Sequence, residues 1–196
     1  MNDRDSPQVI VIAGPNGSGK STAAPTLLRD YLGVTEFVNA DVIALGLSAY
    51  GSENVAIQAG RIMLKRLDEL TAERSSFAFE TTLASRSFAS RIQELTERGY
   101  QSHLLYLWLP TPEIAVSRVK NRVLNGGHNI PEEVVRRRYF AGLENLFNLY
   151  RPLVDYWRLY DNSQPYGYEL IAKESKTDKL LISQMDKWNQ ISKVLQ

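Results

Sequence analysis

The chain has 196 residues, of which 43% are hydrophobic and 23% charged, a composition typical of one soluble globular domain. The formal net charge of +1 argues against a nucleic-acid binder, and the lack of cysteine excludes disulfides, thiolate metal sites and cysteine nucleophiles. The polar first residues do not resemble a signal peptide, and no apolar stretch is long enough to span a membrane. We therefore expect a cytoplasmic protein without membrane contact.

A glycine-rich loop follows the first apolar run of the chain, residues 9–13. Its spacing is G-x-x-x-x-G-K-[ST], in the sequence Gly14-Pro15-Asn16-Gly17-Ser18-Gly19-Lys20-Ser21-Thr22. Glycines let backbone N–H groups close around a polyphosphate, Lys20 supplies charge to the terminal phosphates, and the Ser21 hydroxyl can bind Mg²⁺. The motif predicts a P-loop in which residues 14–22 bind ATP with Mg²⁺. The alternative is a glycine-rich turn that binds no ligand.

Strands and helices alternate along the chain, which is typical of an α/β fold with a parallel sheet. We expect strands at 9–13, 36–41, 76–82, 103–109 and 157–162, and helices at 20–31, 53–74, 87–98, 112–125 and 131–150. A C-terminal edge strand or hairpin (169–173 with 179–182) and a short helix follow. The pattern predicts a P-loop NTPase/kinase-type three-layer sandwich with a mainly parallel five-stranded sheet and a helical lid.

Acidic residues stand at the ends of the second and third expected strands. Because ligands of such sheets bind at the carboxyl ends of the strands, Asp41 and Glu80 should converge with the P-loop. Asp41 is suited to accept the proton of an attacking hydroxyl, although it can instead cap the segment 42–47. Glu80, with Thr81 and Thr82, is expected to orient a Mg²⁺-bound water or to hold substrate hydroxyls. The alternative is that Glu80 is a strand-end acid that only caps Thr81 and Thr82.

The segment 118–138 is strongly basic and is broken by two glycines. Arg118 and Arg122 share one helix face, and three consecutive arginines, 136 to 138, follow on the next helix. This favours a lid whose arginines stabilise the transferring phosphate, although most charge runs are solvated helix faces. At most two of the consecutive arginines can face the site. We assign the roles as follows: nucleotide binding to Arg118, catalysis to Arg122 and Arg137, and substrate binding to His128 and Arg138.

Other P-loop classes fit less well. The base-reading motif N-K-x-D of GTPases is absent, and so is the apolar run ending in Asp-Glu of motor ATPases. We therefore expect one kinase domain over residues 1–196, with a core at about 8–165 and an extension at about 166–196, that phosphorylates a hydroxyl of a small molecule. A kinase for nucleic-acid ends and a regulatory ATPase without kinase activity remain alternatives. The segment 161–163 is a candidate for contact with the adenine.

An ordered set of motifs resembles the zeta-toxin-like P-loop kinases over about residues 8–165. Besides the P-loop it comprises Asn39-Ala40-Asp41, Phe79-Glu80-Thr81-Thr82-Leu83, the arginines through Gly127-His128 and Ile130-Pro131, and Tyr160-Asp161-Asn162-Ser163. The resemblance implies ATP- and Mg²⁺-dependent phosphorylation of a UDP-activated amino sugar such as UDP-N-acetylglucosamine, and an antitoxin partner. It also implies that Lys20, the base Asp41, Arg122 and one of the arginines 136 to 138 carry the reaction.

The chain departs from the family pattern on the substrate side. It has Glu80-Thr81-Thr82 where the family resemblance leads us to expect Glu-Gly-Thr, and no basic residue closely follows Asp41. It is also shorter than the founding toxins. Because these departures lie on the substrate side, they do not affect the prediction of a kinase. They do affect the prediction of a sugar-nucleotide acceptor.

Overall fold

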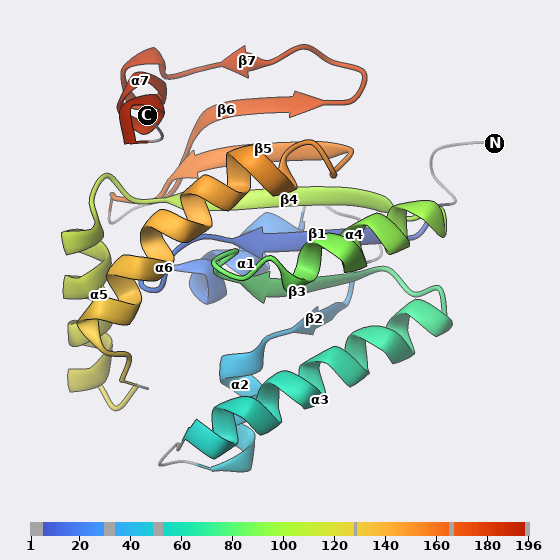
Figure 1. Cartoon of the computed structure of the whole chain (residues 1–196), viewed down its shortest axis with the longest axis horizontal. Coiled ribbons are helices and arrows are strands. Elements are labelled where there is room, and N and C mark those ends of the chain that lie inside the picture. Colours follow the sequence, from blue (N-terminus) through green and yellow to red (C-terminus); the bar gives the residue numbers. More distant parts are fainter. Residues whose placement is uncertain (1–5, 30–33, 49–52, 128, 165–166, 195–196) are drawn as a thin grey trace.

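The protein is built on a twisted sheet, seen in a computed structural model that describes residues 6–29, 34–48, 53–127, 129–164 and 167–194 (Figure 1). In these residues the sheet has seven strands in the order β2-β3-β1-β4-β5-β6-β7. Their bounds are β1 Gln8–Ala13, β2 Glu36–Val38, β3 Phe77–Thr81, β4 Gln101–Trp108, β5 Tyr156–Asp161, β6 Glu169–Ser175 and β7 Leu181–Ile182. The first five strands are parallel, whereas β6 and β7 pair antiparallel. The prediction of a mainly parallel five-stranded α/β core with a C-terminal hairpin is confirmed.

Helices cover both faces of this sheet (Figure 1). They are α1 Lys20–Arg29, α2 Ala40–Leu47, α3 Glu53–Ala72, α4 Ser87–Glu97, α5 Pro112–Leu124, α6 Glu132–Asn145 and α7 Met185–Val194. A π-helical segment, η1 Leu146–Tyr150, continues α6. None of the helices in the described part of the chain is both long and apolar enough to cross a membrane.

The core is divided by β1, whose last five residues are fully buried. Because successive side chains of a strand point to opposite faces, Val9 and Val11 join the cluster formed with α3, α4, α6 and α7. Ile10 and Ile12 join the second cluster, formed with α1. Burial on both faces explains the unbroken apolar run before the P-loop.

The second strand is shorter than predicted. It ends at Val38, and Asp41 lies in the first turn of α2 rather than in the strand. The reason is a side-chain cap, because Asn39 Oδ1 accepts hydrogen bonds from the backbone nitrogens of Asp41 (2.8 Å) and Val42 (3.3 Å). Asp41 therefore does not cap the segment 42–47. That segment belongs to α2, whose N-cap residue is Asn39.

Candidate nucleotide and phosphoryl-transfer site

The glycine-rich loop connects the end of β1 to the start of α1, and a helix N-terminus has free backbone N–H groups that can bind an anion. Gly14 has φ +140°, and a Cβ there would lie 2.3 Å from the carbonyl oxygen of Leu107. Gly19 has φ +81°, and its Cβ would lie 2.6 Å from Nδ2 of Asn162. Both positions require glycine, since a side chain has neither the backbone conformation nor the space.

Lys20 is buried at the first position of α1, where 5% of its surface is exposed. Its Nζ donates a 3.0 Å hydrogen bond to the carbonyl oxygen of Pro15 and lies 3.6 Å from Oε1 of Glu80. Burial lowers the pKa of Lys20, while the charges of Glu80 and Asp41 offset part of that effect. The ammonium group is thus held inside the loop, close to two carboxylates.

The carboxylate of Glu80 in β3 bonds to the start of α1 and to the residue that follows β2. Ser21 Oγ donates to Glu80 Oε2 over 2.6 Å, and Asn39 Nδ2 donates to the same oxygen over 2.6 Å. Asn39 Nδ2 also donates to Ser21 Oγ over 3.2 Å. The whole Asn39 residue is 5% exposed and thus buried. Asn39 was not among the predicted site residues. The sequence did contain a signal for it, because asparagine often caps helices and this one directly follows an expected strand.

Asp41 and Arg122 face each other across the mouth of the site. Arg122 Nη1, in the last turn of α5, lies 3.8 Å from Asp41 Oδ2 in the first turn of α2. Both side chains are partly exposed, 51% for Asp41 and 40% for Arg122. The carboxylate is therefore open to a molecule from solvent, with a guanidinium beside it.

The three consecutive arginines of α6 lie in different surroundings. Arg138 Nη1 donates to Asn16 Oδ1 over 3.2 Å, and burial lowers the pKa of this arginine. Arg136 is bonded to Glu132 and Glu113, with its Nη1 lying 2.6 Å from Glu113 Oε1, which raises its pKa. Arg137 is exposed. Of these three arginines, Arg138 is the one that contacts the P-loop.

Arg118 lies beside the P-loop without bonding to its backbone. Its Nη1 and Nη2 donate to the carbonyl oxygens of Asn162 and Ser163, each over 2.8 Å. Asn162 in turn donates from Nδ2 to the carbonyl oxygen of Ser18 over 2.7 Å. The turn after β5 thus forms one wall of the site. His128, predicted to bind substrate, lies outside the described residues.

Residues 1–164 match the zeta toxin family. The chain belongs to this family. An uncharacterized protein of Haemophilus influenzae is 33% identical over 134 residues, which are 67% of this chain and 92% of that protein.

Two solved structures share the fold of this family member. One, a chain of the AvrRxo1-ORF1:AvrRxo1-ORF2 complex with sulphate ions, has a TM-score of 0.76 at 15% identity over 95% of this chain. The match spans 64% of the length of that chain, and the same complex has also been solved with ATP. The other comes from the PezAT toxin-antitoxin system of Streptococcus pneumoniae, with a TM-score of 0.65 at 14% identity, covering 97% of this chain and 86% of that one. At these identities the likeness concerns the fold.

The loop after β3 of this zeta toxin family member is held by α6. Leu83 is buried with φ +56°, an unusual conformation for a residue with a branched side chain. Asn145 Nδ2 donates to its carbonyl oxygen over 2.8 Å, and a Cβ on Gly142 would lie 2.4 Å from the carbonyl oxygen of Thr82. The helix that carries Arg138 thus packs directly on the loop that follows Glu80. Strained backbone of this kind gathers at functional sites.

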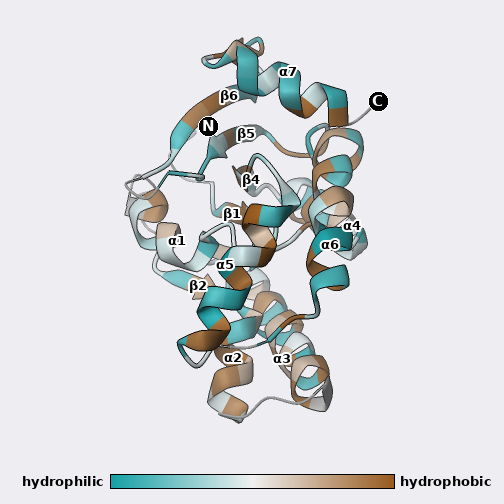
Figure 2. Ribbon diagram, turned by 90° about the vertical axis from the view of Figure 1, so that its left-hand side faces the viewer, coloured by the Kyte–Doolittle hydropathy of each residue, from teal (hydrophilic) through white to brown (hydrophobic). Residues whose placement is uncertain are grey.

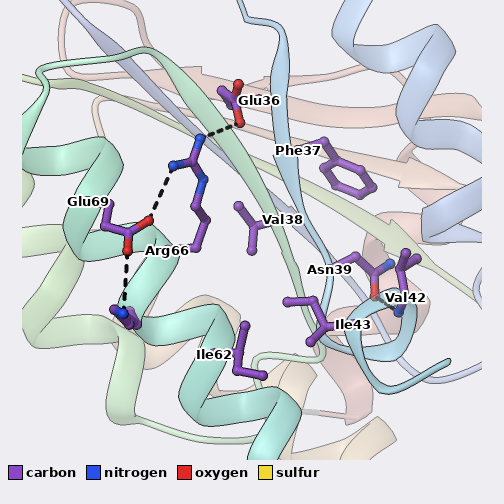
Figure 3. Close-up of a pocket in the computed structure, with 10 residues that line it drawn as sticks. Glu36, Phe37, Val38, Asn39, Val42, Ile43, Ile62, Arg66 and Glu69 are labelled. Carbon is purple, nitrogen blue, oxygen red and sulfur yellow. Dashed lines mark hydrogen bonds and ion pairs between the residues drawn. The ribbon is translucent and has the colours of Figure 1, made fainter. Parts of the chain in front are cut away.

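A cavity of about 490 Å³ lies between β2, α2 and α3 (Figure 3). Its apolar lining comes from Phe37, Val38, Val42, Ile43 and Ile62. Its charged groups bond to one another, since Arg66 bridges Glu36 (3.0 Å) and Glu69 (3.3 Å).

The cavity continues into an apolar surface. Helix α2, largely brown in Figure 2, has no buried residue, and its Val42 side chain is exposed. Among the described residues, Asn39 alone belongs both to the cavity and to the cluster around Glu80. The candidate site lies on the P-loop side of Asn39, where Glu80 contacts both Ser21 and Lys20.

Proposed function

We propose that this zeta toxin family member is an ATP-dependent kinase that transfers the γ-phosphate to a hydroxyl of a small molecule. The observation that carries the proposal is the convergence of the P-loop with Glu80 and with the Asp41–Arg122 pair at the carboxyl edge of the sheet. In a switch or motor the group beside the γ-phosphate has to position only a water molecule. A kinase needs a carboxylate open to solvent for its acceptor.

In this proposal residues 14–22 bind the phosphates of ATP. Lys20 exchanges its hydrogen bond with Pro15 for one with a terminal phosphate, and Arg118 orders the turn that closes the nucleotide site. The AvrRxo1-ORF1:-ORF2 complex with ATP supports the choice of nucleotide.

The polar groups around Ser21 fit a Mg²⁺ ion. The Ser21 hydroxyl and the Glu80 carboxylate are hard oxygen donors 2.6 Å apart, and Asn39 fixes the carboxylate from its other side. The described residues hold no group of three or more metal-ligating side chains, but Mg²⁺ with ATP uses one or two protein ligands and completes its shell with phosphates and water. A Mg²⁺ ion held there would neutralise charge on the phosphates.

Asp41 acts as the general base in the proposed reaction. The acceptor oxygen attacks the γ-phosphorus, the bond from that phosphorus to the β–γ bridging oxygen breaks, ADP leaves, and the hydroxyl proton passes to Asp41. Arg122, 3.8 Å from Asp41, stabilises charge on the transferring group. We assign the second arginine to Arg138, which contacts Asn16, and keep Arg137 as the candidate from the sequence to be tested against it.

We further propose an amino-sugar nucleotide such as UDP-N-acetylglucosamine as the acceptor, and an antitoxin as partner. Family membership supports both proposals, and the PezAT toxin-antitoxin system supports the partner. Glu80, Thr81 and Thr82, with Arg138 and His128, are the proposed contacts on the acceptor side.

The test is transfer of phosphate from ATP and Mg²⁺ to a panel of UDP-sugars, free sugars, nucleosides and short oligonucleotides, measured as mass gain. We expect one added phosphate on a UDP-amino sugar, lost in Asp41→Asn and retained in Asp68→Asn, whose carboxylate is exposed on α3 away from the site. Slow ATP hydrolysis that Asp41→Asn leaves unchanged, with no acceptor modified, would favour a regulatory ATPase.

A further inference from the structure

The C-terminal helix is tied by an ion pair to the wall of the nucleotide site. Lys187 of α7 places Nζ 2.5 Å from Oδ2 of Asp161, the last residue of β5. The Asp161 side chain is 1% exposed and that of Lys187 is 28% exposed. Lys187 also lies 3.0 Å from Oε2 of Glu169 on β6. Helix α7 thus lies at the edge of the sheet where the parallel strands end (Figure 1).

The second carboxylate oxygen of Asp161 shapes the turn that follows. Asp161 Oδ1 accepts a hydrogen bond from the backbone nitrogen of Ser163 over 2.8 Å. Between them, the backbone nitrogen of Asn162 donates to the carbonyl oxygen of Trp108 over 3.0 Å. The buried Asp161 carboxylate therefore forms an ion pair with Lys187 of α7 and accepts a hydrogen bond from the backbone of the turn.

Asn162 connects the turn 161–163 to the P-loop. Its Nδ2 donates to the carbonyl oxygen of Ser18, and a Cβ on Gly19 would lie 2.6 Å from the same nitrogen. The Asn162 amide thus occupies the space that a side chain at residue 19 would need, and a displacement of the turn would lengthen its bond to Ser18. The backbone that would surround the phosphates is thus sensitive to the position of the turn.

The ion pair matters because Asp161 is buried. A buried carboxylate that loses its partner is strongly destabilised, and the chain can relieve this by moving the turn toward solvent. Burial alone would lower the pKa of Lys187, but its bonds to Asp161 and Glu169 outweigh this and raise the pKa. Lys187 is therefore charged at neutral pH, and Asp161 keeps its partner.

A second bond links α7 to the same edge. Gln190 Nε2 donates to the carbonyl oxygen of Pro110, just after β4, over 3.3 Å. Helix α7 therefore contacts the segments that follow both β4 and β5, although the family match ends at residue 164.

We propose that Lys187 is a positioning residue for the nucleotide site. Through Asp161 and the turn 161–163 it holds Asn162 on the P-loop, so that a segment beyond the matched family region sets the affinity for ATP. This inference rests on the proposed function only in naming ATP as the ligand. The mechanical link between α7 and the P-loop is present without it.

The test compares Lys187→Met with Lys193→Met, a substitution of the same kind at an exposed position of the same helix. Calorimetric titration with ATP and Mg²⁺ should give about five- to ten-fold weaker binding for Lys187→Met, the lower range of couplings between separate sites. Amide hydrogen exchange without nucleotide should be faster at residues 161–163 and 18–20. Lys193→Met should match the wild type in both measurements, and Lys187→Arg should restore most of the affinity.

A double variant separates positioning from general loosening. Lys187→Met with Asp161→Asn leaves no unpaired buried charge, and the Asn side-chain oxygen still accepts from the Ser163 nitrogen. We expect it to recover most of the ATP affinity lost in the single variant. No recovery would overturn the role of Asp161 as the connecting residue.

The outcomes also distinguish this inference from the proposed function. Wild-type affinity and wild-type exchange in Lys187→Met would overturn the inference and leave the kinase proposal standing. A wild type that binds no ATP would overturn the kinase proposal, while hydrogen exchange would still decide whether α7 restrains the P-loop. Should Lys187→Met fail to fold, Lys187→Gln, which keeps an N–H donor on a side chain one atom shorter and removes the charge, should show the same exchange changes at smaller amplitude. Wild-type hydrogen exchange in Lys187→Gln would overturn the inference.

Discussion

The hydroxyl of Ser21 donates a 2.6 Å hydrogen bond to Oε2 of Glu80, 59 positions later in the chain. The other carboxylate oxygen of Glu80 lies 3.6 Å from the ammonium group of Lys20. The end of β3 is thereby joined to the first two side chains of α1, Lys20 and Ser21. A change at Glu80 should act on the metal and phosphate part of the site before it acts on the acceptor.

Glu80→Gln keeps the shape of the side chain and removes its charge. We expect the rate of phosphate transfer to fall by about 10- to 100-fold, as found for outer partners of metal sites, and the Mg²⁺ concentration for half-maximal rate to rise. Initial rates over a Mg²⁺ titration measure both. Glu97→Gln, at an exposed position of α4, is the control. An unchanged rate and Mg²⁺ requirement would remove Glu80 from the site.

The arginines at 137 and 138 can be compared directly. Because Arg138 contacts Asn16 of the P-loop and Arg137 is exposed, Arg138→Ala should lower the transfer rate by about 100-fold, and Arg137→Ala far less. Parallel measurements of the transfer rate and of ATP affinity separate loss of catalysis from loss of binding. A larger loss of rate in Arg137→Ala would return the catalytic assignment to Arg137.

Much of the fold could be predicted from the sequence because its signals are local. The apolar run before Gly14 and the alternation of strands and helices are such signals, and the parallel core and the C-terminal hairpin followed from them. The end of β2 was misplaced because Asn39, Ala40 and Asp41 continue the strand in sequence, whereas the Asn39 side chain caps α2. The π-helical turn after Asn145 has no comparable sequence signal.

The candidate site could be predicted where residues follow strands and not where they pair across the fold. The positions of Asp41 and Glu80 near the P-loop follow from strand order, while their roles stay predictions. Three consecutive arginines look alike in sequence, and what distinguishes Arg136 is its bond to Glu113 of another helix. The pairing of Lys187 with Asp161 spans 26 positions and depends on how α7 packs, which no spacing rule conveys.

His103 makes the stability of the protein depend on pH. It is buried on β4, and burial, with a contribution from Arg158, lowers its pKa to about 4. Because the unfolded chain has the ordinary pKa near 6.5, it binds the proton between pH 6.5 and pH 4 while the folded chain does not, so stability falls as pH falls through this window. We expect His103 to account for about 2 kcal/mol of lost unfolding free energy between pH 7 and pH 5.

Urea unfolding of the wild type and His103→Gln at pH 7 and pH 5 measures this contribution. Glutamine does not titrate, so the variant should lose less stability over this interval than the wild type. An equal loss in both proteins would mean that His103 is not the titrating group.

Asn145 restrains the loop after Glu80, since its Nδ2 donates to the carbonyl oxygen of Leu83, whose φ is +56°. Asn145→Ala leaves that acceptor without its donor, so we expect a loss of about 1 kcal/mol in unfolding free energy and faster hydrogen exchange at residues 82–84. The transfer rate should fall as well, because this loop begins two residues after Glu80 and helps to fix its position. Asn148→Ala, at an exposed position three residues further on, should change none of these quantities. If both variants gave the same unfolding free energy and exchange rates, the contact with Leu83 would have no part in ordering the loop.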